Sequence, residues 1–131
     1  YINDLIMDMC PTMVAAPYLG MCNKGGKQWL VYSFLNGTTL EDVLIECAEC
    51  YSLLPLAEAL GVADFEDDDP NSLRRLVNEV AEQLLTLCVE LEGAGVAHRD
   101  VKPYNIFIAD KRILLIDFGS AAAMGVRGRK G

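Results

Sequence analysis

Polar side chains are concentrated in one stretch of an otherwise apolar sequence, between positions 98 and 119. They are His98, Arg99, Asp100, Lys102, Asn105 and Asp117. The oxygens of Asn105 and Asp117 suit a hard cation such as Mg²⁺, which proteins hold through one or two carboxylates together with substrate phosphates. Lys102 suits a phosphate as a point charge, and Asp100 could take or orient a proton from an attacking hydroxyl. The set predicts phosphoryl transfer.

The order of these residues resembles the motifs of protein kinases. Residues 98–105, His-Arg-Asp-Val-Lys-Pro-Tyr-Asn, are similar to the protein-kinase catalytic loop, and residues 117–119, Asp-Phe-Gly, are similar to its metal-binding motif. A lone Asp-Phe-Gly would carry little weight. A match to the whole loop, followed by a hairpin and then by Asp-Phe-Gly, is a specific signal.

This resemblance implies a role for each matching position. Asp100 would be the catalytic base, and Asn105 and Asp117 would be the magnesium ligands. Lys102 would steady the transferred phosphate, and a lysine in this place resembles serine/threonine kinases rather than tyrosine kinases. The implied cofactors are ATP and Mg²⁺, and the implied substrate is a protein hydroxyl.

The resemblance extends back along the chain to a nucleotide site. Residues 29–40 are similar to the last strand of a kinase N-lobe, the hinge and the start of the next helix. By this resemblance the backbones of Ser33 and Leu35 would bind adenine, Phe107 would pack under its ring, and Tyr32 would be the gatekeeper. For Tyr32 and Phe107, an ordinary place in the core is the open alternative.

Local patterns predict the elements that position the polar stretch. Apolar residues recur at i, i+3, i+4 and i+7 from Leu73 to Leu91, which predicts a long helix. Residues 69–72 supply a capping start, and Gly93 and Gly95 supply a stop. Short apolar runs on either side of Asp110-Lys111 predict a hairpin with polar residues at its open end.

Weaker patterns precede the long helix. Residues 3–9 have helical spacing, and residues 14–21 and 28–34 read as an antiparallel pair around a Gly-rich turn. Residues 35–39 read as a turn in which Thr38 or Thr39 caps the next helix. The acidic stretch 63–71 reads as an exposed loop, with recruitment of a basic partner as the alternative.

The predicted fold is α+β, a protein-kinase-like two-lobe fold present as a partial domain. Residues 1–34 would end the N-lobe with a helix tail and two antiparallel strands, residues 35–39 would be the hinge, and residues 40–131 would belong to the C-lobe, up to the start of the activation segment. The Gly-rich phosphate loop and the strand lysine of a kinase N-lobe are not found in these 131 residues. The segment alone is therefore expected to be incomplete as a kinase.

Charge and composition limit the kinds of partner that this chain is expected to bind. A formal charge of −8 argues against a nucleic-acid or anionic-membrane surface, and no apolar run approaches the ~20 residues of a membrane span. The five cysteines, an odd number, read as reduced thiols in an intracellular reducing compartment. Cys47 and Cys50 read as thiols one helical turn apart, with a redox or metal role as the alternative.

Two rival functions remain at this level. A pseudokinase or kinase-like scaffold that docks on a larger assembly would need no catalysis, whereas Asp100, Lys102, Asn105 and Asp117 together favour activity. A small-molecule kinase of related fold is disfavoured by the lysine and proline at positions 102 and 103.

A narrower resemblance concerns the acidic insertion and the run 117–124, Asp-Phe-Gly-Ser-Ala-Ala-Ala-Met. Both are similar to features of the chloroplast state-transition kinases, which phosphorylate light-harvesting antenna proteins. This similarity implies a chloroplast, thylakoid-associated location.

Overall fold

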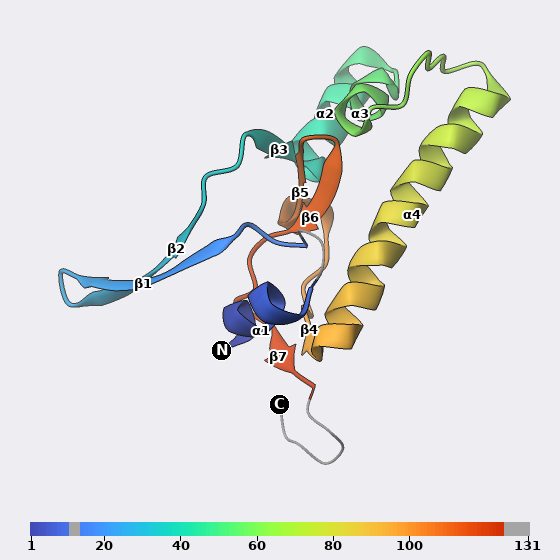
Figure 1. The fold of residues 1–131 in the computed structure, drawn as a ribbon. Helices are drawn as coiled ribbons and strands as arrows, with labels where there is room; N and C mark the ends of the chain where they lie inside the picture. Colours follow the sequence, from blue (N-terminus) through green and yellow to red (C-terminus); the bar gives the residue numbers. More distant parts are fainter. Residues whose placement is uncertain (11–13, 125–131) are drawn as a thin grey trace.

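A computed structural model describes residues 1–10 and 14–124 of the chain (Figure 1). The end of the predicted C-lobe portion, residues 125–131, lies outside the described residues, as do residues 11–13. The helices are α1 (Ile2–Met9), α2 (Leu40–Cys50), α3 (Leu54–Leu60), α4 (Pro70–Ala94) and the short 3₁₀ helix η1 (Pro103–Asn105). The strands are β1 (Tyr18–Lys24), β2 (Lys27–Tyr32), β3 (Gly37–Thr39), β4 (Val96–Ala97), β5 (Ile106–Ala109), β6 (Arg112–Leu115) and β7 (Ala122–Ala123).

Three small antiparallel sheets connect these elements. They contain β1 with β2, β4 with β7, and the three strands β3, β5 and β6 in that order. In Figure 1 the three-stranded sheet lies at the centre, with α2 and α3 beyond one end and α4 along its side. The α+β expectation is confirmed in this coarse form, as a mixture of helices and antiparallel strands.

The core forms where β5 and β6 meet the helices. The strands contribute Ile106, Ile108, Ile113 and Leu115, and the helices contribute Val43, Leu76, Leu87 and Leu91, each at most 6% exposed. Burial of this apolar surface stabilises the fold by about 25 cal/mol per Å² removed from water. The central sheet and α4 therefore act as one packed body.

Helix α4 confirms the predicted long helix and its ends. The Asp69 carboxylate accepts a hydrogen bond from the Asn71 amide at 3.0 Å, and Pro70 occupies the first turn. Gly95, at φ 71°, ends the helix, and its amide donates to the carbonyls of Leu91 and Glu92.

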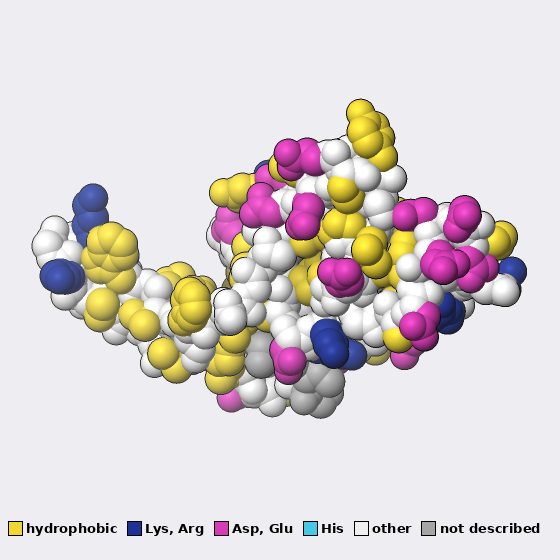
Figure 2. Space-filling model, turned by 90° about the horizontal axis from the view of Figure 1, so that it is seen from above, with side chains coloured by type: hydrophobic (Ala, Val, Ile, Leu, Met, Phe, Trp, Pro, Cys, Tyr) yellow, Lys and Arg dark blue, Asp and Glu magenta, His cyan; other side chains and the backbone are white. Residues whose placement is uncertain are grey.

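The hairpin β1–β2 extends away from the rest of the chain (Figure 1). Gly25 and Gly26 form its turn with φ values of 60° and 75°, as a tight hairpin of this hand requires. Figure 2 shows apolar side chains along it, and Leu19, Met21 and Trp29 are all more than half exposed.

Among the described residues, no helix combines the length and apolarity needed to cross a bilayer.

The segment predicted as a turn at 35–39 contains a strand. Residues 37–39 form β3, which pairs with β5 so that Gly37 lies opposite Ala109 and Thr39 opposite Phe107. The turn prediction is wrong here because the partner strand is about 70 residues away in the chain, and three residues carry no readable period. Thr39, one of the two candidate caps, accepts a hydrogen bond from the Asp42 amide at 3.1 Å.

Helix α3 and the acidic stretch organise one end of the molecule. The sequence patterns did not predict α3. Its start is held by Asp67, whose carboxylate accepts from the Ser52 hydroxyl at 2.6 Å and from the Leu53 amide at 2.7 Å. These hydrogen bonds lower the pKa of Asp67 from its ordinary value. Acidic side chains gather over this end in Figure 2, and Glu66 and Asp68 are exposed.

Candidate active site

The two polar motifs are brought together by the pairing of β4 with β7. Val96 lies opposite Ala123 and Ala97 opposite Ala122. The loop that begins at His98 leaves β4 at the same end of this small sheet at which the segment 117–121 enters β7. Residues nearly 20 positions apart therefore share one site.

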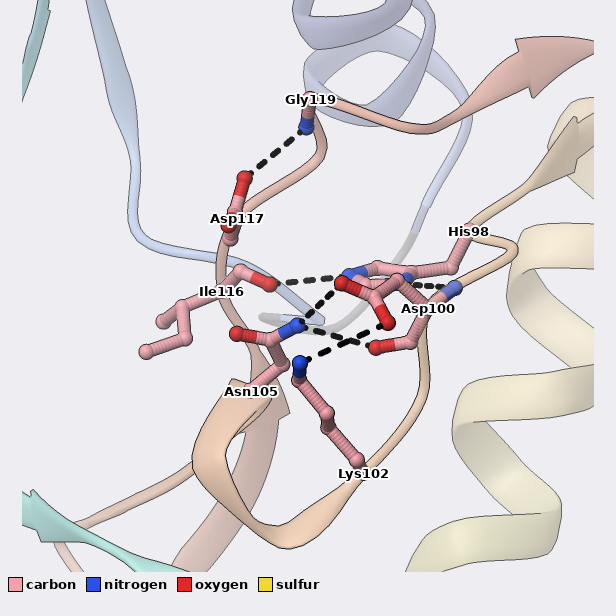
Figure 3. Close-up of polar contacts among 7 residues, drawn as sticks. All are labelled: His98, Asp100, Lys102, Asn105, Ile116, Asp117 and Gly119. Carbon is pink, nitrogen blue, oxygen red and sulfur yellow. Dashed lines mark hydrogen bonds and ion pairs between the residues drawn. The ribbon is translucent and has the colours of Figure 1, made fainter.

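His98 ties the two motifs to each other. The side chain is 4% exposed, and its Nδ1 accepts a hydrogen bond from the Asp100 amide at 3.1 Å. Because Nδ1 accepts, the ring proton sits on Nε2, which donates to the Ile116 carbonyl at 2.8 Å (Figure 3). The ring also packs edge-on against Phe118, with centroids 4.6 Å apart.

Asn105 holds Asp100 through one side-chain amide group. Its Nδ2 donates to the Asp100 backbone carbonyl at 2.9 Å and to the Asp100 carboxylate at 3.0 Å (Figure 3). The other carboxylate oxygen of Asp100 lies 3.8 Å from the Lys102 ammonium. Both charged side chains are well exposed, so this pair stabilises the fold little, about 0–1 kcal/mol at most. Asn105 is 1% exposed, whereas Asp100 and Lys102 face solvent.

The carbonyl oxygen of the Asn105 side chain has no hydrogen-bond partner among the described residues, although it is buried. A buried acceptor without a partner costs about 1–3 kcal/mol, so such an atom calls for an explanation. Asp117, which follows Ile116, supplies a carboxylate, and amide and carboxylate oxygens are the kinds of ligand that suit a hard cation such as Mg²⁺.

Asp117 adopts an unusual backbone conformation for a residue with a side chain. Its φ is 56°, and its carboxylate accepts a hydrogen bond from the Gly119 amide at 3.1 Å (Figure 3). Arg99 also has a positive φ, 70°, and its Nε donates to the Ser120 carbonyl at 2.6 Å. Such conformations concentrate at functional sites, where the surrounding contacts hold them in place.

A cavity of about 410 Å³ opens beside Asp117. It lies between α1, β2 and the Asp-Phe-Gly segment, and its walls include Ile2, Asn3, Leu30, Tyr32, Phe118 and Gly119. The Tyr32 hydroxyl donates to the Asn3 side-chain oxygen at 3.1 Å, which links β2 to α1 across the wall. Tyr32 thus faces this cavity rather than the core.

The predicted adenine contacts lie elsewhere. Ser33, Leu35 and Phe107 are not among the described residues that line the cavity. Ser33 donates its backbone amide to the Pro17 carbonyl at 2.8 Å, and Leu35 is partly buried just before β3. Phe107 lies in β5, opposite Thr39. The structure therefore brings together Asp100, Lys102, Asn105 and Asp117 but does not gather the three nucleotide residues around the same cavity.

Two participants were not predicted from the sequence. Ile116 contributes backbone groups, its carbonyl to His98 and its amide to Asn105, which no side-chain pattern reveals. Asn3 lies in a short helix far from the motifs, and only its polarity within an apolar run could have drawn attention.

The cysteine pair does not extend this site. Cys47 is buried and Cys50 is exposed. Within residues 1–10 and 14–124 no group of three or more His, Cys, Asp or Glu side chains is arranged to hold a metal ion. Burial raises the pKa of the Cys47 thiol, which disfavours the reactive thiolate.

Comparison with known proteins finds serine/threonine protein kinases among the relatives of this chain. No protein-family model matches the chain. The chain is 30% identical to the chloroplastic serine/threonine-protein kinase STN8 of Arabidopsis thaliana over 124 residues, which cover 94% of the chain and 24% of that protein. It is 27% identical to the chloroplastic kinase STN7 of the same plant, covering 96% of the chain and 23% of that protein.

A shorter match involves the interferon-induced, double-stranded RNA-activated protein kinase of Rattus norvegicus, with 44% identity over 52 residues, 39% of the chain and 10% of that protein. The chain spans about a quarter of the length of the two plant relatives. The resemblance to serine/threonine protein kinases, the two chloroplastic enzymes among them, is thereby confirmed for this chain.

Proposed function

We propose that this chain is the catalytic portion of a serine/threonine protein kinase that transfers the γ-phosphate of ATP to a protein hydroxyl. The observation that carries the proposal is the dual use of the Asn105 side chain. Its amide nitrogen holds Asp100, while its buried oxygen is left without a partner in the described residues. One residue would then orient the base and contribute to a cation site.

Asp100 is suited to act as the base. Its backbone is held at the amide by His98 and at the carbonyl by Asn105, which limits rotation of the loop. Its side chain remains 39% exposed, so an acceptor hydroxyl can approach the carboxylate. Such a base takes the hydroxyl proton as the hydroxyl oxygen attacks phosphorus. The first requirement is that the base lies within hydrogen-bond reach of the hydroxyl, and its pKa is the second.

The cation site would use Asn105 and Asp117. A bound Mg²⁺ would supply neutralisation of the charge on the phosphates. The hydrogen bond from the Gly119 amide keeps the Asp117 carboxylate oriented. Lys102, 53% exposed and beside Asp100, would contact the transferred phosphate.

The nucleotide site and the two-lobe arrangement belong to the same proposal. Because the Ser33 amide already donates to Pro17, the Ser33 carbonyl is the group that would accept a hydrogen bond from adenine. The Leu35 backbone and the Phe107 ring would complete the contact. Residues 1–34 would then belong to an N-lobe, residues 35–39 to the hinge and residues 40–131 to a C-lobe.

The relatives also support a proposed location. STN8 and STN7 are both named as chloroplastic. We infer a chloroplast location for this protein and a protein substrate, as in a serine/threonine kinase.

The decisive test is an Asp100→Asn variant of the purified full-length protein that contains this chain, assayed for ATP- and Mg²⁺-dependent phosphate transfer to a generic protein substrate. Asparagine keeps the acceptor for the Asn105 amide and removes the basic charge, so we expect a loss of about 10²- to 10⁴-fold in rate. Asp68→Asn makes the same chemical change at an exposed position and serves as the control.

Equal rates in the Asp100 variant and the wild type would remove Asp100 from the mechanism. A wild-type protein that neither transfers phosphate nor binds Mg²⁺–ATP would instead support the non-catalytic scaffold.

A further inference from the structure

The side chain of Gln83 links α4 to the central sheet through buried hydrogen bonds. It is 3% exposed, in the middle of a face that otherwise packs apolar residues. Its amide nitrogen donates to the Lys111 carbonyl at 3.0 Å and to the Glu79 carboxylate at 2.8 Å. Its oxygen accepts from the Ile113 amide at 2.6 Å. A buried amide with its groups satisfied in this way is costly to disturb.

The groups that Gln83 binds belong to the backbone of one hairpin. Asp110 and Lys111 form the turn between β5 and β6, with φ values of 50° and 63°. Ile113 lies in β6, the outer strand of its sheet, and no strand of the described residues pairs with β6 at Ile113 on the outward side. Gln83 closes this edge at Ile113, and the Val14 carbonyl closes it at Leu115, at 2.8 Å.

The hairpin carries the proposed cation ligands at its other end. Asn105 directly precedes β5, and Asp117 follows β6 by two residues. The Ile116 amide donates to the Asn105 carbonyl at 2.9 Å, which holds the two ends side by side. A rotation of the hairpin would therefore move Asn105 and Asp117 together.

Helix α4 carries the proposed base. It ends at Gly95, and β4 then leads directly into the loop with His98 and Asp100. The base thus follows α4 in the chain, whereas the cation ligands flank the β5–β6 hairpin, and Gln83 bonds α4 to that hairpin.

We propose that Gln83 is a positioning residue that sets the orientation of the β5–β6 hairpin relative to α4, and so the placement of Asn105 and Asp117 against Asp100. This inference rests on the proposed function for its catalytic consequence. A displacement of about 1 Å between reacting groups can reduce a rate on the order of a hundredfold, so a small tilt is sufficient.

The test compares Gln83→Met with wild type in the purified full-length protein that contains this chain. Methionine is similar in length and unbranched, so it fills the space and removes all three hydrogen bonds. Gln28→Met, at an exposed position of β2, is the matched control. Gln83→Glu is a second variant, which keeps the acceptor for Ile113, loses both donors and brings a like charge to Glu79.

Three readouts separate positioning from simple loss of stability. They are hydrogen exchange of the Ile113 and Ile116 amides, the NMR shift of the Asn105 side-chain amide, and kcat with the Mg²⁺ concentration at half-maximal rate. For a folded Gln83→Met we expect exchange at both amides to rise by about tenfold. We also expect the Asn105 signal to move and kcat to fall about tenfold, with KM for the protein substrate unchanged.

An Asn105 signal and a kcat within about twofold of wild type in the folded variant would overturn the inference. If Gln83→Met does not fold, the same readouts are measured on Gln83→Glu. An Asn105 signal and a kcat at wild-type values in that variant would again overturn the inference. If the wild type transfers no phosphate, the proposed function fails, and the Asn105 signal and the Ile116 exchange alone decide whether Gln83 positions the site.

Discussion

Gly37 in β3 leaves no room for a Cβ against β5, and its replacement by alanine should be strongly destabilising. A Cβ at this position would lie 2.8 Å from a ring carbon of Phe107 and against the backbone carbonyl oxygen of Ile108. A side chain can turn away from a new methyl group, but the carbonyl of a paired strand cannot. Strand β3 would have to move away from β5.

The magnitude follows from what this movement disturbs. Overpacking of a methyl group in a rigid site costs about 1–3 kcal/mol. The displaced strand also weakens backbone hydrogen bonds of the β3–β5 ladder, each worth about 1 kcal/mol net. We expect Gly37→Ala to lower the free energy of unfolding by about 2–4 kcal/mol. Because Phe107 is displaced as well, ATP affinity should fall if this ring contacts adenine.

Urea unfolding followed by circular dichroism measures the change, with Gly93→Ala as the control. Gly93 lies in the last turns of α4, where an added Cβ meets no atom within 4 Å. Alanine is the better helix former, so this variant should gain up to about 1 kcal/mol. If Gly37→Ala stays within about 0.5 kcal/mol of wild type, the close approach of β3 to β5 is wrong.

Two further predictions concern the acidic end and the thiols. Asp67→Asn should lower the thermal midpoint at neutral pH, because Asp67 accepts from Ser52 and Leu53 and its folded pKa lies below the ordinary 3.8. A carboxylate whose pKa is lowered by folding stabilises the fold at pH values above its unfolded pKa, and this stabilisation is lost as the pH falls through its folded pKa. The difference in thermal midpoint between variant and wild type should therefore shrink below pH 3.8. A difference in midpoint that stays constant with pH would contradict this. Iodoacetamide, followed by peptide mass spectrometry, should label exposed Cys50 about tenfold or more faster than buried Cys47, whose pKa is raised. Equal labelling rates would refute the burial of Cys47.

Elements with a local signal were predictable. The spacing from Leu73 to Leu91 predicts α4, and Asp69 and Gly95 mark its ends because capping uses side chains and φ values of the chain itself. The β1–β2 turn follows from Gly25 and Gly26 in the same way. Helix α3 was not predicted because its start is held by Asp67, a residue that lies outside the helix, beyond its C-terminal end.

The candidate site divides along the same line. Asp100, Lys102, Asn105 and Asp117 were chosen from residue type and spacing, and their roles stay predictions. In the structure Lys102 and Asn105 contact Asp100, and Asp117 follows Ile116, whose amide donates to the Asn105 carbonyl. The adenine contacts were not gathered around the cavity next to Asp117, because the positions of Ser33 and Phe107 depend on strand pairing that no short pattern encodes.

The sequence by itself determined the chemistry available to this protein: two acids, an amide and a lysine at the spacing of a kinase loop, together with the periodic helix that precedes them. Only the tertiary structure decided which atoms are engaged. It showed that the Asn105 nitrogen serves Asp100 while its oxygen stays without a partner in the described chain. It also showed that Gln83, a polar residue on an apolar face, bonds α4 to the hairpin. The physical reason is that local propensity depends on neighbours in the chain, whereas burial and hydrogen-bond partners depend on segments that meet only after folding.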